Sequence, residues 1–338
     1  MLTGVHVLLT YRCSHECDHC FLHCGPGSAG TFKLFDLERL LNQALRVESV
    51  KWIYFEGGEP FLYHPLLLEG IRLAKLRGLM VGAVTNAYWA ESPRDAELWL
   101  RPLLDAGLDD LSVSDDLFHF DGEGESPAAF ALEAAGSLGL PARALTLPRP
   151  EDGEGLLYRG RAADKLTEGR PTRPAGSFGA SCPEELLRPG RVHVDPFGHV
   201  HICQGISIGN AFETPLREIF AGWEMVKDHP VVGVGLGNYK LKFLPYKAEF
   251  LASPRGAAYD FPINRAAQAH NEYVQVLAEL GGLGMLALIS LVVILVLSFW
   301  KRLRAGDESQ RFDLLLFACG IVAVFSHAFV SFPAHLPS

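Results

Sequence analysis

The sequence has no excess of basic residues. Its 30 lysines and arginines are outnumbered by 39 aspartates and glutamates, which gives a formal net charge of −9 at pH 7. Nucleic-acid-binding proteins carry a basic footprint, so we expect no nucleic-acid partner. Cysteine is also scarce, with seven in 338 residues. That number excludes the cysteine-dense framework of a small secreted domain.

Two further absences concern the membrane. Residues 1–10 lack the basic start of a signal peptide, so we expect no cleaved leader. Long uncharged apolar runs are absent before residue 283, whereas 283–300 and 314–332 are two such runs. Each approaches the ~20 residues that cross a bilayer. Trp300 followed by Lys301 and Arg302 is typical of a membrane boundary. The sequence predicts a tail anchored by two transmembrane helices; a buried helical hairpin is the alternative.

Three of the cysteines are closely spaced. Cys13, Cys17 and Cys20 form a C-x3-C-x2-C pattern directly after the apolar run 5–10. Thiolates suit iron–sulfur clusters and zinc. Four protein ligands close a structural zinc site, whereas three leave one metal position open. The pattern favours an iron–sulfur cluster with one iron free for another ligand. A zinc site and three unrelated thiols remain alternatives.

The first half of the chain alternates between strand and helix patterns. Apolar stripes at helical spacing predict helices that begin near Asp36, Pro65, Ser92 and Pro127, with Asp36 and Ser92 as N-caps. Such alternation predicts an α/β fold with a parallel sheet, open or closed. The predicted strands are 5–10, 51–55, 80–85, 110–114, 143–147 and 155–159.

Polar motifs follow most of these predicted strands. In α/β barrels, catalytic groups collect at the carboxyl ends of the strands, so we expect the motifs to share one site. They are Cys13 after the first strand, Glu56–Pro60 after the second, Asn86 after the third, Ser112–Asp116 at the fourth, and Arg159 and Arg161 after the last.

These motifs resemble the radical S-adenosylmethionine (SAM) superfamily over about residues 1–228. That family carries C-x3-C-x-aromatic-C, and His19 occupies the aromatic position here. The resemblance implies a partial (βα)6 TIM-like barrel and a [4Fe–4S] cluster held by Cys13, Cys17 and Cys20. It also implies reductive cleavage of SAM to a 5′-deoxyadenosyl radical, with electrons from a flavodoxin or ferredoxin. The substrate, a small molecule or a peptide, is not identified.

The resemblance also implies the residues that would hold SAM. Residues 57–60 match the family's GGEP motif. Each motif has an ordinary alternative: a turn, a surface salt bridge or a solvated acidic loop. Asp115, Asp116 and His119 could orient a substrate or move a proton. The candidates for SAM binding are Gly57, Gly58, Glu59, Pro60, Asn86, Ser112, Ser114, Arg159 and Arg161.

Two more cysteines lie in a possible C-terminal extension, residues 166–228, beyond a core of residues 1–165. Residues 191–203 predict a β-hairpin around Pro196–Gly198, with a helix near 216–224. The extension resembles regions that bind an auxiliary iron–sulfur cluster in some radical SAM enzymes. Cys182 and Cys203 would be its ligands, and two buried free thiols are the alternative.

Residues 230–338 resemble the C-terminal part of the O-antigen ligase/polymerase membrane family. The resemblance rests on the GVGLGNY stretch at 233–239, AHNEY at 269–273 and FVSFPAHLP at 329–337. GVGLGNY lacks the strand, helix and acidic residue of a nucleotide-binding loop. The resemblance implies a polar loop (229–282) before the membrane segment (283–338). Arg265 and His270 would take part in transferring a lipid-linked glycan.

The two resemblances place the chain on opposite sides of a membrane. Lys301, Arg302, Arg304 and Arg311 lie between the predicted spans, and positive loops favour the cytoplasm. Residues before 283 would then be outside, whereas an iron–sulfur enzyme is expected in the cytoplasm. The alternatives are an inverted or poorly inserted hairpin, a recombined reading frame, a glycan-transfer remnant with an inert N-terminal half, and a zinc-binding scaffold.

Overall fold

The computed structural model divides the chain into two compact units, Met1–Ile206 and Ser207–Ser338. We describe each unit by itself. The sequence predicts domain boundaries at residues 165, 228 and 282, on the basis of motifs and hydropathy. These boundaries stay predictions. The structure describes residues 2–120, 122, 124–147, 156, 158–169, 186, 189–203, 206–236, 238, 239, 272–305 and 318.

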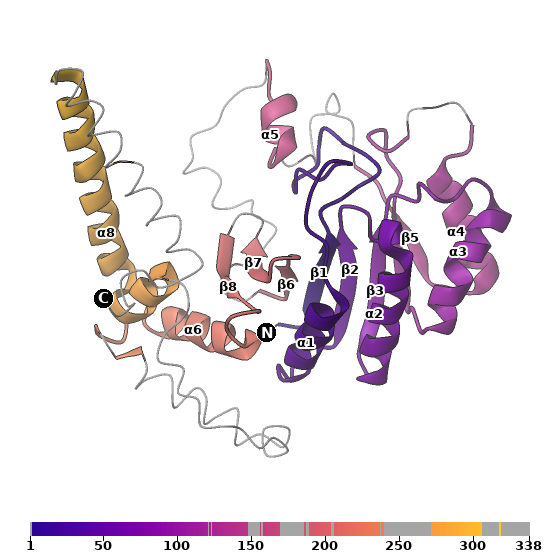
Figure 1. Cartoon of the computed structure of the whole chain (residues 1–338), viewed down its shortest axis with the longest axis horizontal. Coiled ribbons are helices and arrows are strands. Elements are labelled where there is room, and N and C mark those ends of the chain that lie inside the picture. Colours follow the sequence, from indigo (N-terminus) through magenta and orange to yellow (C-terminus); the bar gives the residue numbers. More distant parts are fainter. Residues whose placement is uncertain are drawn as a thin grey trace. The chain divides into compact units, whose positions relative to one another are not determined.

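A largely parallel sheet forms the centre of the first unit (Figure 1). Its strand order is β5-β4-β3-β2-β1-β6-β7. Each neighbouring pair from β5 to β6 is parallel, and β7 is antiparallel to β6. The strands are β1 (Gly4–Thr10), β2 (Trp52–Gly57), β3 (Met80–Thr85), β4 (Asp110–Ser114), β5 (Ala142–Leu145), β6 (Arg191–Val194) and β7 (His199–Cys203).

The helices begin and end at residues suited to those positions. The Ser92 and Ser126 hydroxyls accept hydrogen bonds from the first turns of α3 and α4, and Gly139 ends α4 in the left-handed region. The N-cap prediction for Asp36 is wrong, because α1 begins earlier and Lys33 precedes it. The helices are α1 (Leu34–Leu45), η1 (Pro60–Tyr63), α2 (His64–Leu76), α3 (Pro93–Asp105), α4 (Pro127–Leu138) and α5 (Arg161–Lys165).

The two faces of the sheet differ in chemistry because side chains alternate along a strand. On one face, Val5, Val7, Ile53 and Phe55 are fully buried, and α1–α4 cover this side (Figure 1). The residues between them, including His6, line a cavity on the other face. One face therefore stabilises the fold, and the other is available for chemistry.

The prediction of a sixth strand at 155–159 is wrong. Leu156, Tyr158 and Arg159 are not in a strand. The sixth parallel strand is β6, which also forms the predicted hairpin with β7, where His193 lies opposite His201. The hairpin and the α/β class are confirmed. The parallel sheet ends at β5 without closing on β6, and the partial barrel stays a prediction.

In the second unit, the long C-terminal helix is interrupted, and the backbone of residues 230–234 packs against the interruption. The unit contains β8 (Ile206–Asn210), α6 (Leu216–Asp228) and α8 (Glu272–Ala305). Gly281 interrupts α8 with φ of 64°. The N–H of Gly282 donates to Pro230 O at 2.7 Å, and that of Val234 to Ala278 O at 2.8 Å. A Cβ on Gly281 would lie 2.4 Å from the Val231 carbonyl carbon, so glycine permits this approach.

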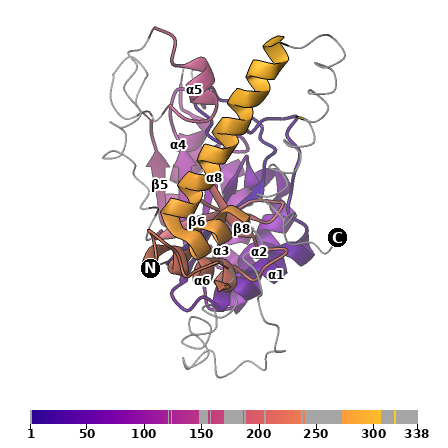
Figure 2. The ribbon, with the colours of Figure 1, turned by 90° about the vertical axis from the view of Figure 1, so that its left-hand side faces the viewer.

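Beyond the break, α8 continues as a long helix (Figure 2), and many of its large apolar side chains between Leu283 and Trp300 are exposed. In the described part of the chain, Tyr273–Leu303 is the one helix long and apolar enough to cross a membrane. Leu286, Val296 and Trp300 are each more than half exposed. A soluble helix would bury such a surface. This helix contains the predicted span 283–300, whereas 314–332 lies outside the described residues apart from Ala318.

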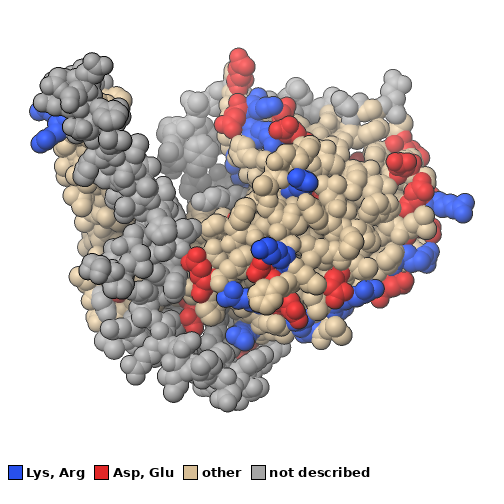
Figure 3. Space-filling model, in the orientation of Figure 1, with Lys and Arg blue, Asp and Glu red and all other residues tan. Residues whose placement is uncertain are grey.

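Charged side chains form no large patch of one sign on the face drawn in Figure 3, as far as the described residues show. Lysines and arginines are interspersed with aspartates and glutamates. Some of them pair, such as Lys75 with Asp109 at 2.8 Å and Arg101 with Glu97 at 3.1 Å. Exposed pairs of this kind contribute little to stability.

We predict that Phe55→Ala destabilises the first unit strongly. Phe55 is fully buried, and a Cβ on Gly70 of α2 would come within 2.8 Å of its ring. Removing a buried phenylalanine costs about 3–5 kcal/mol. The matched control is Phe35→Ala, because Phe35 is 73% exposed. Denaturant unfolding should show the loss for Phe55 alone, and equal effects would contradict the packing described here.

Candidate active site

The three predicted metal ligands lie together at one end of the sheet. Cys13, Cys17 and Cys20 belong to the loop after β1, and all three line a cavity of about 860 Å³. Cys24, in the same loop, lines it as well. The donor set fits an iron–sulfur cluster, because three thiols of one loop face one cavity with room for a further ligand.

A buried arginine holds this loop. Arg161 is 7% exposed, and its Nη1 and Nη2 donate to the carbonyl oxygens of Cys17 and Cys24, each at 2.7 Å. Its backbone N–H donates to Cys20 O at 2.9 Å. Arg161 was predicted to pair with a SAM carboxylate. Its guanidinium instead fixes the backbone around the cysteines, and it does not line the cavity.

The cysteine thiols differ in acidity. A hydrogen bond from the Cys24 side chain lowers the pKa of Cys20 to about 6, although burial opposes this. Burial raises the pKa of Cys13 to about 11. Donation to Cys20, together with burial, raises the pKa of Cys24 far above its usual value. Cys20 is thus a thiolate at neutral pH, the form that binds metal.

The glycine motif after β2 contacts the backbone of the cysteine loop. The N–H groups of Gly58 and Glu59 donate to Thr10 O at 2.7 Å and Arg12 O at 2.9 Å. Gly57 has φ of 126°, a conformation that favours glycine. A Cβ on Gly58 would lie only 2.1 Å from Arg12 O. Both glycines line the cavity.

Glu59 is buried beneath the motif. Its carboxylate accepts hydrogen bonds from Phe61 N at 3.0 Å, Thr85 Oγ1 at 2.9 Å and Asn86 N at 2.7 Å. Burial nevertheless raises the pKa of Glu59 to about 7. Glu59 and Pro60 are buried and do not line the cavity. In this structure Glu59 connects the glycine motif to the end of β3.

Asn86 extends this network to the cysteine loop. Its Nδ2 lies 3.0 Å from Ser14 Oγ, 3.0 Å from His15 Nδ1 and 3.5 Å from Cys13 Sγ. The loops after β1, β2 and β3 are therefore linked through Glu59 and Asn86, as expected for one site.

The residues predicted at the end of β4 separate into two groups. Ser112, Ser114, Asp116 and His119 line the cavity. His119 Nδ1 lies 2.8 Å from Asp116 Oδ1. Burial opposes its charge, but the bonds to Asp116 and Cys17 raise the pKa of His119 to about 10. Asp115 instead accepts a hydrogen bond from Ser126 at the start of α4 and is not among the lining residues.

The remaining candidates lie elsewhere or outside the described residues. Arg159 lines the cavity, with its guanidinium carbon 5.5 Å from the centre of the Phe21 ring. Cys203 is a half-buried thiol on β7. Cys182, Arg265 and His270 are outside the described residues.

Several polar residues of the cavity were not predicted. They lie on the sheet face opposite the helices, where alternate positions of the strands are polar. The sequence shows this alternation in His199-Val200-His201 and in His6-Val7. The sequence does not show which face of the sheet the helices cover, so it does not show which of these residues line a cavity. The residues are His6, Tyr54, Arg143, Arg191 and His193, and Glu56, which begins the predicted motif after β2, lines the cavity beside them.

Comparison with known families confirms both resemblances. Residues 7–119 match the radical SAM superfamily, and residues 217–289 match O-antigen ligase. The chain thus contains a region that matches the radical SAM superfamily, followed by a region similar to O-antigen ligase. The second match begins within α6, before the position expected from the sequence.

Two curated relatives are similar to part of the chain. The putative peptide biosynthesis protein YydG of Bacillus subtilis is 24% identical over 115 residues, 34% of this chain and 36% of that protein. A tungsten-containing aldehyde ferredoxin oxidoreductase cofactor-modifying protein of Pyrococcus furiosus is 31% identical over 83 residues, 24% of this chain and 23% of that protein. The chain therefore spans well under two thirds of either relative.

Solved structures with similar arrangements share little sequence. BtrN in complex with AdoMet and 2-DOIA is 16% identical, with a TM-score of 0.47 over 76% of this chain and 90% of that one. anSMEcpe with bound AdoMet is 15% identical, with a TM-score of 0.46 over 65% of this chain and 80% of that one.

We predict that Gly58→Ala prevents normal assembly of the cysteine loop. The new Cβ would meet a backbone oxygen, which cannot rotate away as a side chain can. Gly27→Ala is the matched control, since its Cβ would meet no atom within 4 Å. Iron content after anaerobic reconstitution should fall for Gly58→Ala only. Full iron loading of this variant would contradict the close approach.

We predict that Arg161→Lys accelerates loss of bound iron. An ammonium group cannot span two carbonyl oxygens as a guanidinium does, and each charged hydrogen bond contributes about 1.5–3 kcal/mol. We expect iron release to a chelator to be about tenfold faster or more. Arg159→Lys is the control and should retain iron. If Arg161 acts on SAM instead, weaker SAM binding with unchanged iron retention would be observed.

Proposed function

We propose that the first unit binds a [4Fe–4S] cluster and SAM, and cleaves SAM reductively to act on a substrate in the cavity. One observation carries this proposal. The three cysteines and the glycine motif line one cavity, in a region that matches the radical SAM superfamily. A zinc scaffold would not need a cavity of about 860 Å³ beside its ligands.

Each residue has a defined part in this proposal. Cys13, Cys17 and Cys20 would hold the cluster, which would offer SAM the position left without a protein ligand. Gly57 and Gly58 expose backbone close to the amino group. When bound and reduced, the cluster supplies the electron that splits SAM into methionine and a 5′-deoxyadenosyl radical. Further positioning of SAM falls to Asn86, Ser112, Ser114 and Arg159, which all line the cavity.

Asp116 and His119 are the candidates for handling the substrate. They form a close pair on the cavity wall, and the proton they share could be donated to a bound group. Asp115 is a weaker candidate for contacting the substrate, because its carboxylate accepts a hydrogen bond from Ser126, the N-cap of α4. The pair lies beside Cys17, so the substrate would approach the reacting end of SAM.

The substrate is a peptide or a small molecule. The printed name of the Bacillus subtilis relative, a putative peptide biosynthesis protein, supports a peptide. A flavodoxin or ferredoxin would supply electrons, which places the first unit in the cytoplasm. An auxiliary iron–sulfur cluster on Cys182 and Cys203 remains part of the proposal for the extension.

The second unit would attach the enzyme to a membrane. The apolar surface of α8 and the O-antigen ligase match support this role, with a second span at 314–332 as part of the proposal. A remnant of glycan transfer, with Arg265 and His270 in its site, is the alternative function that the same match favours.

The deciding experiment measures 5′-deoxyadenosine. The full chain, purified without oxygen and reconstituted with iron and sulfide, receives SAM and dithionite. We expect 5′-deoxyadenosine from the wild type and at least a hundredfold less from Cys17→Ala. Cys319→Ala, far along the chain, is the matched cysteine control.

The outcomes separate the alternatives. Formation of 5′-deoxyadenosine by Cys17→Ala would contradict the assignment of the cluster ligands. A chain that binds zinc and no iron, and forms no product, would support the scaffold. Glycan transfer that survives Cys17→Ala would support the membrane alternative.

A further inference from the structure

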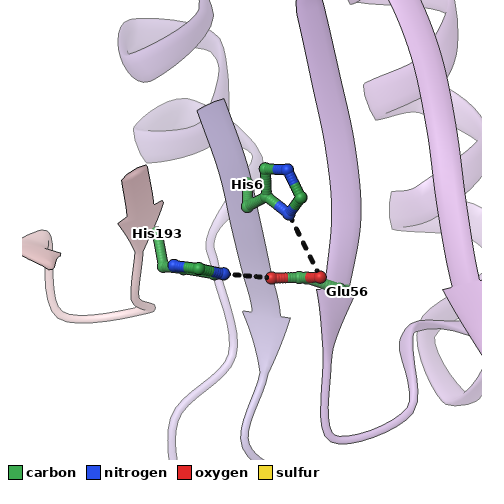
Figure 4. A group of neighbouring side chains, drawn as sticks. All are labelled: His6, Glu56 and His193. Carbon is green, nitrogen blue, oxygen red and sulfur yellow. Dashed lines mark ion pairs between the residues drawn. The ribbon is translucent and has the colours of Figure 1, made fainter. Parts of the chain in front are cut away.

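Three side chains from different strands converge on the cavity face of the sheet (Figure 4). They are His6 on β1, Glu56 on β2 and His193 on β6. His6 and His193 are direct cross-strand neighbours. Glu56 Oε2 lies 3.2 Å from His6 Nδ1, and Glu56 Oε1 lies 3.0 Å from His193 Nε2. One carboxylate therefore lies between two imidazoles.

The cluster is buried, yet its polar atoms are poorly satisfied. His193 is 6% exposed. Within the described residues, His6 Nδ1, Glu56 Oε1 and His193 Nδ1 make no hydrogen bond. Glu56 is thus paired with both imidazoles, whereas His193 Nδ1 has no hydrogen-bond partner among the described residues. Buried polar atoms are nearly always hydrogen-bonded, so this cluster lacks a partner that it is built to hold.

The donor set is that of a metal site. One ligand atom from each residue can be chosen so that all three lie within 4.8 Å of one another. Ligands bound to one ion at about 2.0–2.2 Å lie roughly 3.0–3.5 Å apart, and the two measured separations, 3.2 and 3.0 Å, fall in or at the edge of that range. Two histidines and one carboxylate suit Zn²⁺, Fe²⁺ and other first-row ions.

Outer contacts hold one of these ligands in place. The His6 ring stacks on Tyr54, with centroids 4.9 Å apart and planes 20° apart. The Tyr54 hydroxyl donates to Asp110 Oδ2 at 3.0 Å, and Arg143 pairs with the same carboxylate at 2.8 Å. These contacts restrict rotation of the His6 ring.

We propose that His6, Glu56 and His193 bind a divalent first-row transition-metal ion at the floor of the cavity. Three protein ligands leave coordination positions open. All three residues line the cavity, so a small molecule there could reach the ion. This site is distinct from the cysteine loop. A second cluster, His19, Asp116 and His119, borders Cys17 and belongs to the site already described.

The simpler alternative is an ion pair without metal. Burial opposes ionisation of Glu56, but the charges of His6 and His193 hold its pKa well below the usual range. An ion pair explains the charge state of Glu56 but leaves buried His193 Nδ1 without a hydrogen-bond partner among the described residues. It also predicts no metal dependence, which makes the two explanations separable.

The test measures metal retention by the full chain with its cysteines occupied by a reconstituted, oxidised cluster. The protein is dialysed to equilibrium against Mn²⁺ and, separately, Zn²⁺, and bound metal is counted by mass spectrometry. We expect the wild type to retain one ion more per chain than Glu56→Gln and His193→Gln. His64→Gln is the matched control, because His64 lies outside the cavity and contacts Trp99 O.

A second readout covers a variant that folds poorly. Bound metal should raise the melting temperature of the wild type and of His64→Gln, but not that of Glu56→Gln or His6→Gln. Equal retention of both ions by wild type and Glu56 or His193 variants, with no metal-dependent stabilisation, would overturn the proposal. Neither readout needs SAM cleavage, so failure of the proposed radical SAM activity would leave this result unaffected.

Discussion

The site depends on two backbone hydrogen bonds between the loops after β1 and β2. Gly58 and Glu59 donate to Thr10 O and Arg12 O at 2.7 and 2.9 Å, and only a residue without Cβ fits at position 58. The same segment then places Glu59 under Asn86, which contacts the cysteine loop. The cysteine loop is therefore positioned by main-chain contacts, and Arg161 holds its far end.

The cavity follows from the unequal covering of the sheet. Helices α1–α4 bury one set of alternate residues, such as Val7 and Phe55. The other set faces the cavity and need not be apolar, so His6, Glu56, Ser112 and His193 are placed there. A fold with one covered face thus supplies both its stability and its reactive surface. The proposed second metal site is a consequence of this arrangement, since its ligands come from three adjacent strands.

The second unit combines packing with an exposed apolar helix. Residues 230–235 fill the break at Gly281 through main-chain hydrogen bonds, and Tyr239 is buried with its N–H on Glu279 Oε1 at 3.2 Å. Residues 230–235, Tyr239 and α8 therefore belong to one packed unit, together with α6. The family match from 217 to 289 covers this same packing. Past the break, many large apolar side chains of α8 are exposed.

The sequence by itself determined the features that depend on neighbouring residues. Cysteine spacing, the GGEP motif, β3 and β4, and α3 with its serine cap at Ser92 are local patterns, and the structure has the two strands and the cap where predicted. Tertiary structure decided what depends on distant segments. The local β-rich run at 155–159 predicts the sixth strand there, whereas pairing with β1 identifies β6 as that strand. Long-range packing likewise directs the Arg161 guanidinium to the backbone of the cysteine loop. It also brings His6, Glu56 and His193 together, and no local sequence pattern specifies either arrangement.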